Sequence, residues 1–585
     1  MTVTKKNESE KLVKGRDLII KSLEDEGVEH IFGYPGGSSM DIHQSLNASK
    51  QIRLVLPRHE QGASFAASGY ARATGKIGVC LATSGPGATN LITGIMDAKM
   101  DSIPMVALTG QVPTHAIGMD AFQEVDIFGA TLPCVKHSYL VKNTEDIPAI
   151  IHEAFQIANS GRKGPVLIDF PKDIQQREVN PSACKMFNRK GFQTRLEPAK
   201  SQVRKAIKLI QEAKRPIIYA GGGLRSLESS QELKQFIEKT GIPVTTTLSG
   251  IGCFPEDHKL SLHMLGMHGA IYANMAINRA DLVLALGVRF DDCVIRDIGE
   301  FCRDAHIIHV DVDASEINKI KIVHVPIQGD AALTLKAFTN EIKEELQIKP
   351  WVSEVMKWKE EFAFSYTALT DVIVPQRVIE KLKKFAPKDS IISVGVGQHQ
   401  MWTAQYFRFQ NPRSFICSSG FGAMGFGLPA AMGAQMAFPD RTVIDIDGDG
   451  SFLMNIQELQ TLKTEKIPVK CVVLNNNHLG MAAQWEDDVC QKSREHTYLG
   501  EANFAEIADA FGLKGEKISR SEEVEPALKR MLAHKGPYVL DVHYPYNDAK
   551  HGHITPMIPK GKTYLDTIMP DGRILRDYLV EKGEL

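Results

Sequence analysis

The stretch from 442 to 481 constrains the fold of this chain most, because it predicts one complete strand-helix-strand unit. It reads TVIDIDGDGSFLMNIQELQTLKTEKIPVKCVVLNNNHLGM. An apolar strand ends at Asp447, a Gly-Asp-Gly turn and a helix of about three turns follow, and a second apolar strand ends at Asn475. A right-handed crossover makes the two strands parallel, so Asp449 and Asn476 emerge at the same carboxyl edge of one sheet. We therefore expect these two side chains to converge.

The side chains at this edge suit a metal ion and a diphosphate. A carboxylate and an amide oxygen are hard ligands of the kind that Mg²⁺ takes when phosphate oxygens complete its octahedron. Gly448 and Gly450 let the backbone come close to a diphosphate, and the helix that begins near Ser451 offers amide groups to it. A bare Gly-Asp-Gly would be an ordinary tight turn. Together with the strand-helix-strand context and Asn475-Asn476, it predicts Mg²⁺ and a diphosphate cofactor.

The rest of the chain repeats this alternation of strands and helices, which predicts parallel sheets with helices on both faces. A chain of 585 residues, 43% of them hydrophobic, can bury several cores, and we expect three domains. The predicted fold class is therefore α/β, with three doubly wound parallel-sheet domains. The predicted boundaries are 11–190, 201–345 and 375–547, with a linker at 180–200, a helical connector at 346–374, and a tail at 548–585 that is a candidate lid or a surface segment.

The predicted strands are short apolar runs in three groups. They lie at 30–35, 52–57, 78–86, 104–110 and 165–171; at 216–222, 243–248, 281–287 and 306–312; and at 390–395, 414–419, 442–447, 469–474 and 537–542. The first and third groups could share a fold, although no repeated sequence indicates it.

Charge and hydropathy exclude two classes of partner. The formal net charge is −2, with 68 Lys and Arg against 70 Asp and Glu, and no long basic run occurs, so we expect neither nucleic acid nor an anionic membrane as a partner. No segment approaches about eighteen unbroken apolar residues, so none is expected to span a bilayer. The partners should be small molecules or other protein chains.

The cysteines and the amino terminus bear on the compartment. Nine cysteines, at 80, 134, 184, 253, 293, 302, 417, 471 and 490, are dispersed without a CxxC pair, which predicts buried free thiols in a reducing surrounding. The sequence MTVTKKNESEKLVKG is polar from its start and has neither the apolar core of a signal peptide nor the Arg- and Ser-rich character of a transit peptide. These features predict a cytoplasmic location.

Glu60 is the main candidate outside the diphosphate stretch. The segment Leu56-Pro57-Arg58-His59-Glu60-Gln61-Gly62-Ala63 places it where a strand ends and a helix rich in small residues begins. A glutamate in the first turn of a helix is most often only a partner of the helix dipole. Its position alone therefore does not assign it a role.

Ten strings in matching order resemble the catalytic subunits of the acetohydroxyacid synthase family, also called acetolactate synthases. This family uses thiamine diphosphate to join two 2-ketoacids with loss of CO₂. The resemblance covers nearly the whole chain. The strings are FGYPGG at 32–37, the Glu60 segment at 56–63, SGPG at 84–87, AFQE at 121–124, PKD at 171–173, LGMH at 265–268, GVRFD at 287–291, VGVGQHQ at 394–400, GAMGFG at 422–427 and QW at 484–485.

The resemblance implies how thiamine diphosphate is held. Glu60 would hydrogen-bond the pyrimidine ring and activate the cofactor, and Met424 would be the apolar wedge that bends it. His478 would give Mg²⁺ a backbone oxygen beside Asp449 and Asn476. Ordinary core packing is the alternative for Met424, and also for His399. The other implied cofactor contacts are Gly37, Val396, Gly397, Gln398, His399, Gly422, Gly448, Gly450, Ser451 and Met481.

The middle domain would bind FAD. From the residues alone, strands that end at Gly287 and Asp311 form the edge where a doubly wound sheet receives a nucleotide. The string Gly221-Gly222-Gly223-Leu224 lacks the last glycine of GxGxxG, so a purely structural domain is the alternative. The resemblance favours a flavin that supports the structure and is not used in turnover. The implied contacts are Arg162, Leu265, Gly266, Met267, His268, Gly287, Val288, Arg289, Phe290, Asp291, Asp311 and Asp330.

The implied substrate residues contain one departure from the family. Gln123 and Lys172 resemble catalytic residues of the substrate channel. Cys293 stands where the family has an arginine that would grip the carboxylate of the second ketoacid, a loss on the order of 2 kcal/mol. Arg296 would share a face with Cys293 if the segment is helical, and we expect it to take over this contact. The implied acceptor pocket contains Phe122, Trp485 and Arg296.

These features predict synthesis of acetolactate from pyruvate, or of the homologous product from 2-ketobutyrate, as the first common step of branched-chain amino acid synthesis. A related decarboxylase or carboligase with a different acceptor is the alternative that Cys293 motivates. A catalytically silent cofactor-binding subunit is a third, against which Glu60 argues. The family places the active site between two chains, so the resemblance implies a homodimer or homotetramer, with a small regulatory subunit as a further candidate partner.

Overall fold

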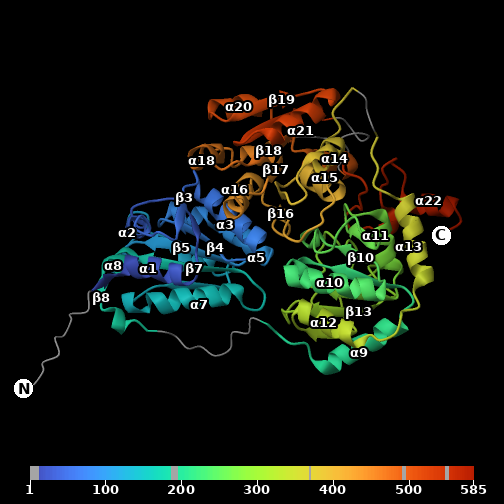
Figure 1. Ribbon diagram of the computed structural model, residues 1–585, viewed down its shortest axis with the longest axis horizontal. Helices are drawn as coiled ribbons and strands as arrows, with labels where there is room; N and C mark the ends of the chain where they lie inside the picture. Colours follow the sequence, from blue (N-terminus) through green and yellow to red (C-terminus); the bar gives the residue numbers. More distant parts are fainter. Residues whose placement is uncertain (1–11, 186–194, 368–370, 490–495, 547–552) are drawn as a thin grey trace, which may run out of the picture. The chain divides into compact units, whose positions relative to one another are not determined.

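The computed structural model describes residues 12–185, 195–367, 371–489, 496–546 and 553–585 (Figure 1). The chain forms two compact units, one of Met1–Thr194 with Met432–Ala437 and the other of Arg195–Ala431 with Phe438–Leu585. Several predictions fall on residues outside those described: the domain limits at 11 and 547, the polar amino terminus, the linker across 186–194, the start of the tail, and Cys490.

Three six-stranded sheets carry the fold, and the strands within each are parallel. The predicted α/β class with three parallel-sheet domains is confirmed. Figure 1 shows helices beside each sheet, as alternating strands and crossovers require.

The first unit contains one of these sheets, in the order β3-β2-β4-β5-β7-β6. Its strands are β2 (His30–Gly33), β3 (Arg53–Val55), β4 (Gly78–Ala82), β5 (Met105–Gln111), β6 (His137–Leu140) and β7 (Pro165–Pro171), with a small antiparallel pair of β1 (Val13–Lys14) and β8 (Glu178–Val179). Its helices are α1 (Gly15–Asp25), α2 (Met40–Leu46), α3 (Glu60–Thr74), α4 (Pro86–Asn90), α5 (Ile92–Met100), α6 (Ile127–Thr131), α7 (Ile147–Asn159) and α8 (Lys172–Gln176).

The second unit contains the other two sheets, and its first part holds the order β11-β10-β9-β12-β13-β14. The strands are β9 (Pro216–Ala220), β10 (Val244–Thr246), β11 (Ser261–Met264), β12 (Leu282–Leu286), β13 (His306–Asp311) and β14 (Val325–Gln328). The helices are α9 (Lys200–Glu212), α10 (Leu227–Thr240), α11 (Ile271–Arg279), α12 (Ala331–Glu341) and α13 (Lys349–Glu361).

The later part of the second unit holds the order β16-β15-β17-β18-β20-β19. Its strands are β15 (Ile391–Val394), β16 (Phe415–Cys417), β17 (Val443–Gly448), β18 (Lys470–Asn475), β19 (Lys514–Ile518) and β20 (Tyr538–His543). Its helices are α14 (Pro375–Phe385), α15 (Gln398–Tyr406), α16 (Gly427–Ala437), α17 (Asp449–Leu453), α18 (Glu458–Glu465), α19 (Gly480–Val489), α20 (Phe504–Ala510) and α21 (Val524–Ala533), and α22 (Leu575–Glu581) belongs to the tail. The residues of α16 from Met432 on belong to the first unit.

Strand order sorts the three sheets into two kinds. Numbered by position along the chain, the first and third sheets both have the order 2-1-3-4-6-5, and the middle sheet has 3-2-1-4-5-6. The first and third sheets thus share a topology, as the sequence suggested. The middle order is that of dinucleotide-binding sheets, which receive their ligand where the order reverses, here between β9 and β12.

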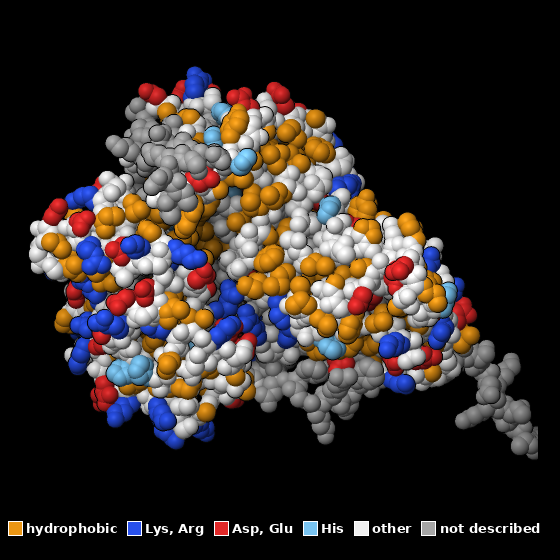
Figure 2. All heavy atoms as spheres, turned by 180° about the vertical axis from the view of Figure 1, so that it is seen from behind, with side chains coloured by type: hydrophobic (Ala, Val, Ile, Leu, Met, Phe, Trp, Pro, Cys, Tyr) orange, Lys and Arg blue, Asp and Glu red, His pale blue; other side chains and the backbone are white. Residues whose placement is uncertain are grey.

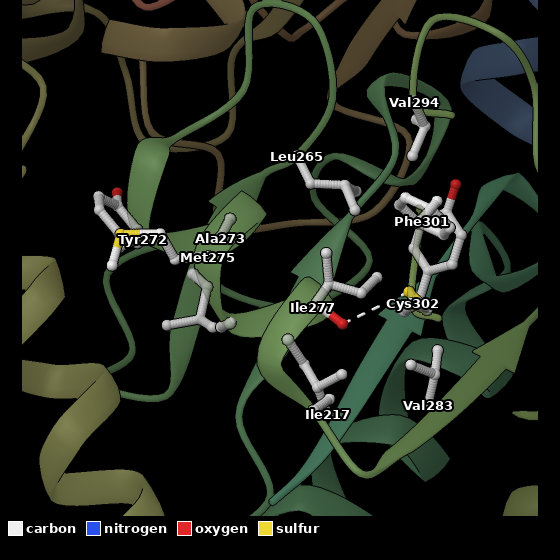
Figure 3. Packing of buried hydrophobic residues seen from close by; sticks show 14 of the residues in the cluster. Ile217, Leu265, Tyr272, Ala273, Met275, Ile277, Val283, Val294, Phe301 and Cys302 are labelled. Atoms are coloured by element: carbon white, nitrogen blue, oxygen red, sulfur yellow. Dashed lines mark hydrogen bonds between the residues drawn. The ribbon is translucent and has the colours of Figure 1, made fainter. Parts of the chain in front are cut away.

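The period-2 alternation of the middle strands builds two separate cores. Ile217 and Tyr219 of β9 pack with α11 on one face, while Ile218 and Ala220 pack with α9, α10 and α12 on the other. Figure 3 shows the first of these cores. Each face of the sheet is therefore covered, as a buried parallel sheet requires.

The described part of the tail is packed into its unit. Leu575 and Leu579 of α22 and Met569 lie in the same core as β9 and α11. In that core the Cys302 thiol donates to the carbonyl oxygen of Ile277 at 3.4 Å (Figure 3). The segment from 553 to 585 is therefore anchored by apolar burial on the middle domain.

The predicted single helix after Asp449 is two short helices, α17 and α18. Asn455 lies between them, and its side-chain amide donates to the carbonyl oxygen of Gly425 at 2.8 Å. An asparagine that bonds to backbone outside its own helix competes with helix propagation. This contact explains the break.

The surface and the thiols agree in part with the sequence analysis. No helix within the described ranges is both long and apolar enough to cross a bilayer. Figure 2 shows acidic, basic and hydrophobic side chains intermixed on the face drawn. None of the described cysteines forms a disulfide, but Cys293 is exposed and Cys134 and Cys184 are only partly buried, so the prediction of buried thiols is wrong for these three.

Candidate active site

Two strand ends of the third sheet meet at the carboxyl edge, as the crossover argument predicted. β17 and β18 are parallel neighbours, with Gly448 beside Leu474. The carboxylate of Asp449 accepts the backbone N–H of Gly450 at 2.8 Å, and the backbone of Asn477 and His478, which follow β18, lies close enough to act on its pKa. The loop after each strand therefore closes on the same carboxylate.

The Asp449 carboxylate has unused capacity for a ligand. Its Oδ2 atom is buried and has no hydrogen-bond partner among the described residues. Burial raises the pKa of Asp449 to about 6. A cation at Oδ2 would reverse this effect, because it stabilises the ionised carboxyl. A buried carboxylate oxygen without a donor is the group that a hard cation requires, and it fits the predicted Mg²⁺.

Asn476 and His478 complete this edge. The Oδ1 atom of Asn476 accepts the backbone N–H of His478 at 3.0 Å, and its amide nitrogen donates to the hydroxyl of Tyr544 at 3.3 Å. The imidazole of His478 is occupied elsewhere, since Nδ1 lies 2.8 Å from the Asn476 carbonyl oxygen and the ring stacks on Tyr546. The backbone oxygen is thus the group of His478 that suits the predicted metal contact.

Glycines and Met424 surround the loop that would receive the diphosphate. A Cβ at Gly450 would lie 2.8 Å from Leu479 and 3.5 Å from the Met424 methyl carbon, and a Cβ at Gly448 would lie 2.7 Å from His399 Nδ1. A side chain at either position would therefore crowd Leu479 or His399. Gly422, with a φ of 67°, precedes Met424 in its loop. Met424 is placed beside the diphosphate loop and is only partly buried, which argues against ordinary core packing.

The Ser451 hydroxyl ties three loops of this edge together. It accepts the backbone N–H of Gly425 at 3.0 Å and, at 3.4 Å, that of Val396 in the loop that ends at Gly397. Ser451 thus holds the loops after β15 and before α16 against the start of α17. Its predicted role toward the cofactor is in part indirect.

Gln398 and His399 begin α15 and are both buried. The amide nitrogen of Gln398 donates to Gln484 Oε1 at 3.0 Å, which links α15 to α19. His399 Nε2 lies 3.3 Å from Asp447 Oδ1. Met481, in the first turn of α19, packs on the hydrophobic core that contains residues of β15, β17 and β18. These contacts place all three predicted cofactor residues around the edge that contains Asp449.

Glu60 begins α3 in the first unit and is 9% exposed. Its Oε2 atom accepts the side-chain amide of Asn90 at 2.9 Å. A Cβ at Gly87 would lie 3.2 Å from Oε1, so the glycine keeps room beside the carboxyl. Asn90 was missed by the sequence analysis. The available signal was its position in α4, one turn after Gly87 and on the same helix face.

The loop that contains Gln123 approaches Gly85 through its backbone. Gln123 has a φ of 60°, which is uncommon for a residue other than glycine. A Cβ at Gly85, two residues before Gly87, would lie 2.7 Å from the Gln123 carbonyl oxygen. Phe122, by contrast, is 88% exposed.

Lys172 lies at the end of β7 and begins α8. Its Nζ atom donates to the carbonyl oxygen of Gly37 at 3.2 Å. The loop of Gly37 is joined to the loop after β4 by a hydrogen bond from the Ser84 hydroxyl to that of Ser38 at 2.9 Å. Lys172 and Gly37 are thus brought together at the carboxyl edge of the first sheet, next to the loop that leads to Gly85.

Three glycines make the ligand edge of the middle sheet close-packed. Gly287, with a φ of 58°, follows β12. A Cβ at Gly223 would lie 2.7 Å from the Gly287 Cα, and one at Gly221 would lie 2.2 Å from its carbonyl oxygen. Gly266, with a φ of 101°, is clamped by Asn274 through two hydrogen bonds of 2.9 and 3.0 Å. Because these glycines carry no side chains, a ligand can come close to the backbone where the strand order reverses. This arrangement fits a dinucleotide.

The remaining predicted flavin residues have local partners. Asp330 caps α12 by accepting the Leu333 N–H at 3.0 Å, and Asp311 accepts the Asp313 N–H at 2.9 Å. Burial lowers the pKa of His268 to about 4, which keeps its ring neutral. Leu265, Met267, Val288 and Phe290 surround this edge, Arg289 and Asp291 follow it, and Arg162 lies in the other unit, where it donates to Ser102 at 2.9 Å.

The segment after Asp291 is a turn and not a helix. Arg296 was expected to share a helical face with Cys293, and this condition is not met. The Ile295 N–H donates to the Asp291 carbonyl oxygen at 2.8 Å, and the chain then leaves helical geometry. Arg296 Nη1 donates to the Asp292 carbonyl oxygen at 3.2 Å, while its Nε is buried without a partner among the described residues. Cys293 and Trp485 are both exposed.

Comparison with known proteins finds the same three-part arrangement. Three family models match: the thiamine pyrophosphate enzyme N-terminal TPP binding domain at 13–130, the central domain at 203–338, and the C-terminal TPP binding domain at 395–542. The chain is 50% identical over 576 residues to Acetolactate synthase 3, chloroplastic, of Brassica napus, covering 96% of this chain and 87% of the relative. It is 49% identical to Acetolactate synthase, chloroplastic, of Arabidopsis thaliana (96% and 85% covered) and to Acetolactate synthase 1, chloroplastic, of Zea mays (96% and 89% covered).

Proposed function

This chain belongs to the acetolactate synthase family of thiamine pyrophosphate enzymes, and from that premise we infer that it joins two molecules of pyruvate, with loss of CO₂, to form acetolactate. The observation that carries the inference is 49–50% identity across 96% of the chain. Incubation with pyruvate, thiamine diphosphate and Mg²⁺ should yield acetolactate. Acetaldehyde would favour the alternative decarboxylase, and no product would favour a silent subunit.

The chain's own residues are assigned to holding the cofactor and to moving one proton. Thiamine diphosphate supplies a ring that accepts an electron pair when CO₂ leaves a 2-ketoacid. We assign Glu60 Oε1, on the side of Gly87, to the pyrimidine ring nitrogen. Asn90 holds Oε2 and so fixes the plane of the carboxyl. Fixing a proton-transferring group before the substrate arrives lowers the barrier through orientation.

The second part of the assignment concerns the diphosphate end. Asp449 Oδ2, the amide oxygen of Asn476 and the backbone oxygen of His478 would bind Mg²⁺, with diphosphate oxygens as further ligands. The buried, unpartnered Oδ2 supports this assignment. Gly448 and Gly450 would admit the diphosphate, and Met424 would press on the cofactor between its two rings.

The middle domain is assigned to FAD. Its strand order and the contacts among Gly221, Gly223 and Gly287 support a dinucleotide at this edge. We expect the purified protein to contain flavin, released on denaturation and measured by its absorbance. Gly223→Val should abolish retention of flavin, because its Cβ would lie 2.7 Å from the Gly287 backbone. Gly299→Ala is the control, since this glycine has no positive φ and its Cβ would meet only Asp297 Oδ1, at 3.3 Å. A flavin-free parent protein would rule out this assignment.

Arg296 is assigned to the carboxylate of the second ketoacid. Its Nε is a buried donor that has no acceptor among the described residues, and Cys293 nearby carries no positive charge that could bind a carboxylate. We expect Arg296→Ala to raise the KM for the second ketoacid about thirtyfold, which corresponds to a charged hydrogen bond of about 2 kcal/mol. Arg303→Ala, an exposed arginine of the same loop region, should leave this KM unchanged. An unchanged KM in Arg296→Ala would show that another group binds the carboxylate.

The surface of the first unit supports a homodimer, in which the partner is a second copy of the chain. Ile117, Met119 and Phe122 expose 37%, 72% and 88% of their surface on one loop, and water does not favour such a group of apolar side chains. A second copy of the chain would cover this loop, and Phe122 and Gln123 would then line a shared site. A single-chain mass by light scattering at micromolar concentration would argue against this. A small regulatory subunit and 2-ketobutyrate as a second acceptor stay predictions.

The predicted cytoplasmic location is wrong by the comparison, because the relatives found are named as chloroplastic proteins. The prediction rested on free thiols and on a polar amino terminus. Free thiols indicate only a reducing surrounding, which more than one compartment provides. Location is read by receptors from an address segment, and the composition of the folded part does not report it.

A further inference from the structure

Two neighbouring aspartates of α19 meet one histidine of the tail. His553 Nε2 lies 3.1 Å from Asp487 Oδ2, and His553 Nδ1 lies 3.3 Å from Asp488 Oδ1. The side chains of His553 and Asp487 are 4% and 2% exposed. Each ring nitrogen thus faces a carboxylate oxygen, and the contact with Asp487 is buried on both sides. This buried bridge holds its geometry better than an exposed ion pair does.

A second pair of hydrogen bonds lies one helical turn earlier. The backbone N–H of Ile554 donates to Gln484 Oε1 at 2.8 Å, and Gln484 Nε2 donates to the Ile554 carbonyl oxygen at 3.0 Å. Gln484, Asp487 and Asp488 are spaced three and four residues apart, so they share one face of α19. The tail residues 553 and 554 therefore bind one whole face of the helix.

The tail is fixed again a few residues further along. The Ile558 N–H donates to the Met267 carbonyl oxygen at 2.8 Å, and Ile554 and Ile558 are buried. Tyr546 adds a donor to Asp487 Oδ2 at 3.1 Å. The tail thus connects α19 to the loop of the middle domain that contains Met267. A helix bound in this way cannot turn about its axis without breaking the buried bridge.

Trp485 lies between the residues that the tail holds. It follows Gln484 directly and precedes Asp488 by three residues, so it lies at the edge of the face that binds the tail, and it is 38% exposed. We propose that His553 is a positioning residue, which fixes the rotation of α19 through Asp487 and Asp488 and thereby places Trp485 for selection of the second ketoacid. This inference rests on the proposed role of Trp485 in the acceptor pocket.

The test is the ratio of two products in a competition assay. The enzyme is given pyruvate and 2-ketobutyrate together, and the two acetohydroxyacids are quantified. His553→Ala should change the product ratio about tenfold, because small displacements at a reacting centre have effects of that size or larger. The affinities for thiamine diphosphate and Mg²⁺, measured by calorimetry, should stay unchanged. Asp488→Ala should give the same change, and the double variant should add little to either.

The control is another ion pair of the same tail. Lys582, directly after α22, pairs with Glu361 at the end of α13, away from α19, so Lys582→Gln should leave the product ratio as in the parent. A parent-like ratio in His553→Ala, with only a lower melting temperature, would mean that the tail acts on stability alone and would overturn the proposal. If the parent enzyme itself formed no acetolactate, both this inference and the proposed function would be overturned.

Discussion

Glu60→Gln is expected to lower kcat by about a hundredfold to ten-thousandfold, the range over which removal of a positioned proton-transfer group acts. Glutamine keeps the size of the side chain and its hydrogen bond to Asn90, so α3 and its surroundings should remain intact. What it loses is the ability to exchange a proton with the pyrimidine nitrogen. Steady-state acetolactate formation at saturating pyruvate measures the effect.

Two further variants separate this role from structural ones. Asn90→Ala removes the donor to Oε2 and should lower kcat about tenfold, because the carboxyl is then less well oriented and a charged hydrogen bond is lost. Glu228→Gln makes the same chemical change in the first turn of α10, at an exposed pair with Arg195, and should have no effect. Calorimetry should show thiamine diphosphate binding to all three. Glu60→Gln with the kcat of the parent would instead show that Glu60 does not transfer the proton.

The sheets were predictable where their strands are central. Every strand predicted from an apolar run is present, whereas the four missed strands of the six-stranded sheets, β6, β11, β14 and β19, all lie at sheet edges. An edge strand is covered on fewer sides, so its sequence needs fewer apolar residues, and β19 reads KGEKI and β6 reads HSYL. Edge strands are specified by pairing with a neighbour, which no local pattern records.

The candidate site was predictable where chain topology fixes it. Asp449 and Asn476 meet because a right-handed crossover leaves two adjacent parallel strands ending at one edge, a rule that needs no knowledge of side-chain packing. Asn90 and His553 were not found, because their partners lie 30 and 66 residues away along the chain and no rule of handedness brings them together. Arg296 does not share a helical face with Cys293, because the segment forms only a single turn that begins at Asp291.

Asp449→Ala is expected to reduce the affinity for Mg²⁺ and thiamine diphosphate by more than about a hundredfold. Loss of a group that only supports a metal ligand costs about ten- to a hundredfold in metal affinity, so loss of the ligand itself should exceed this. Calorimetric titration of the metal, in the presence of thiamine diphosphate, measures the effect directly. Asp449→Asn keeps an oxygen ligand without the charge and should lie between the variant and the parent. Asp440→Ala, an exposed residue before β17, is the matched control.

The melting temperature also tests the role of Asp449, because Asp449→Ala should affect the cofactor-free and the cofactor-bound protein differently. Burial raises the pKa of Asp449 to about 6, so at pH 7 most molecules carry a buried charge whose Oδ2 has no partner among the described residues. Removing that charge should leave the melting temperature of the cofactor-free protein unchanged or raise it. With cofactor at about a hundred times its Kd, the parent should gain about 2.7 kcal/mol and Asp449→Ala almost nothing. If the variant gained as much as the parent, Asp449 would not be a metal ligand, because binding would then not depend on its carboxylate.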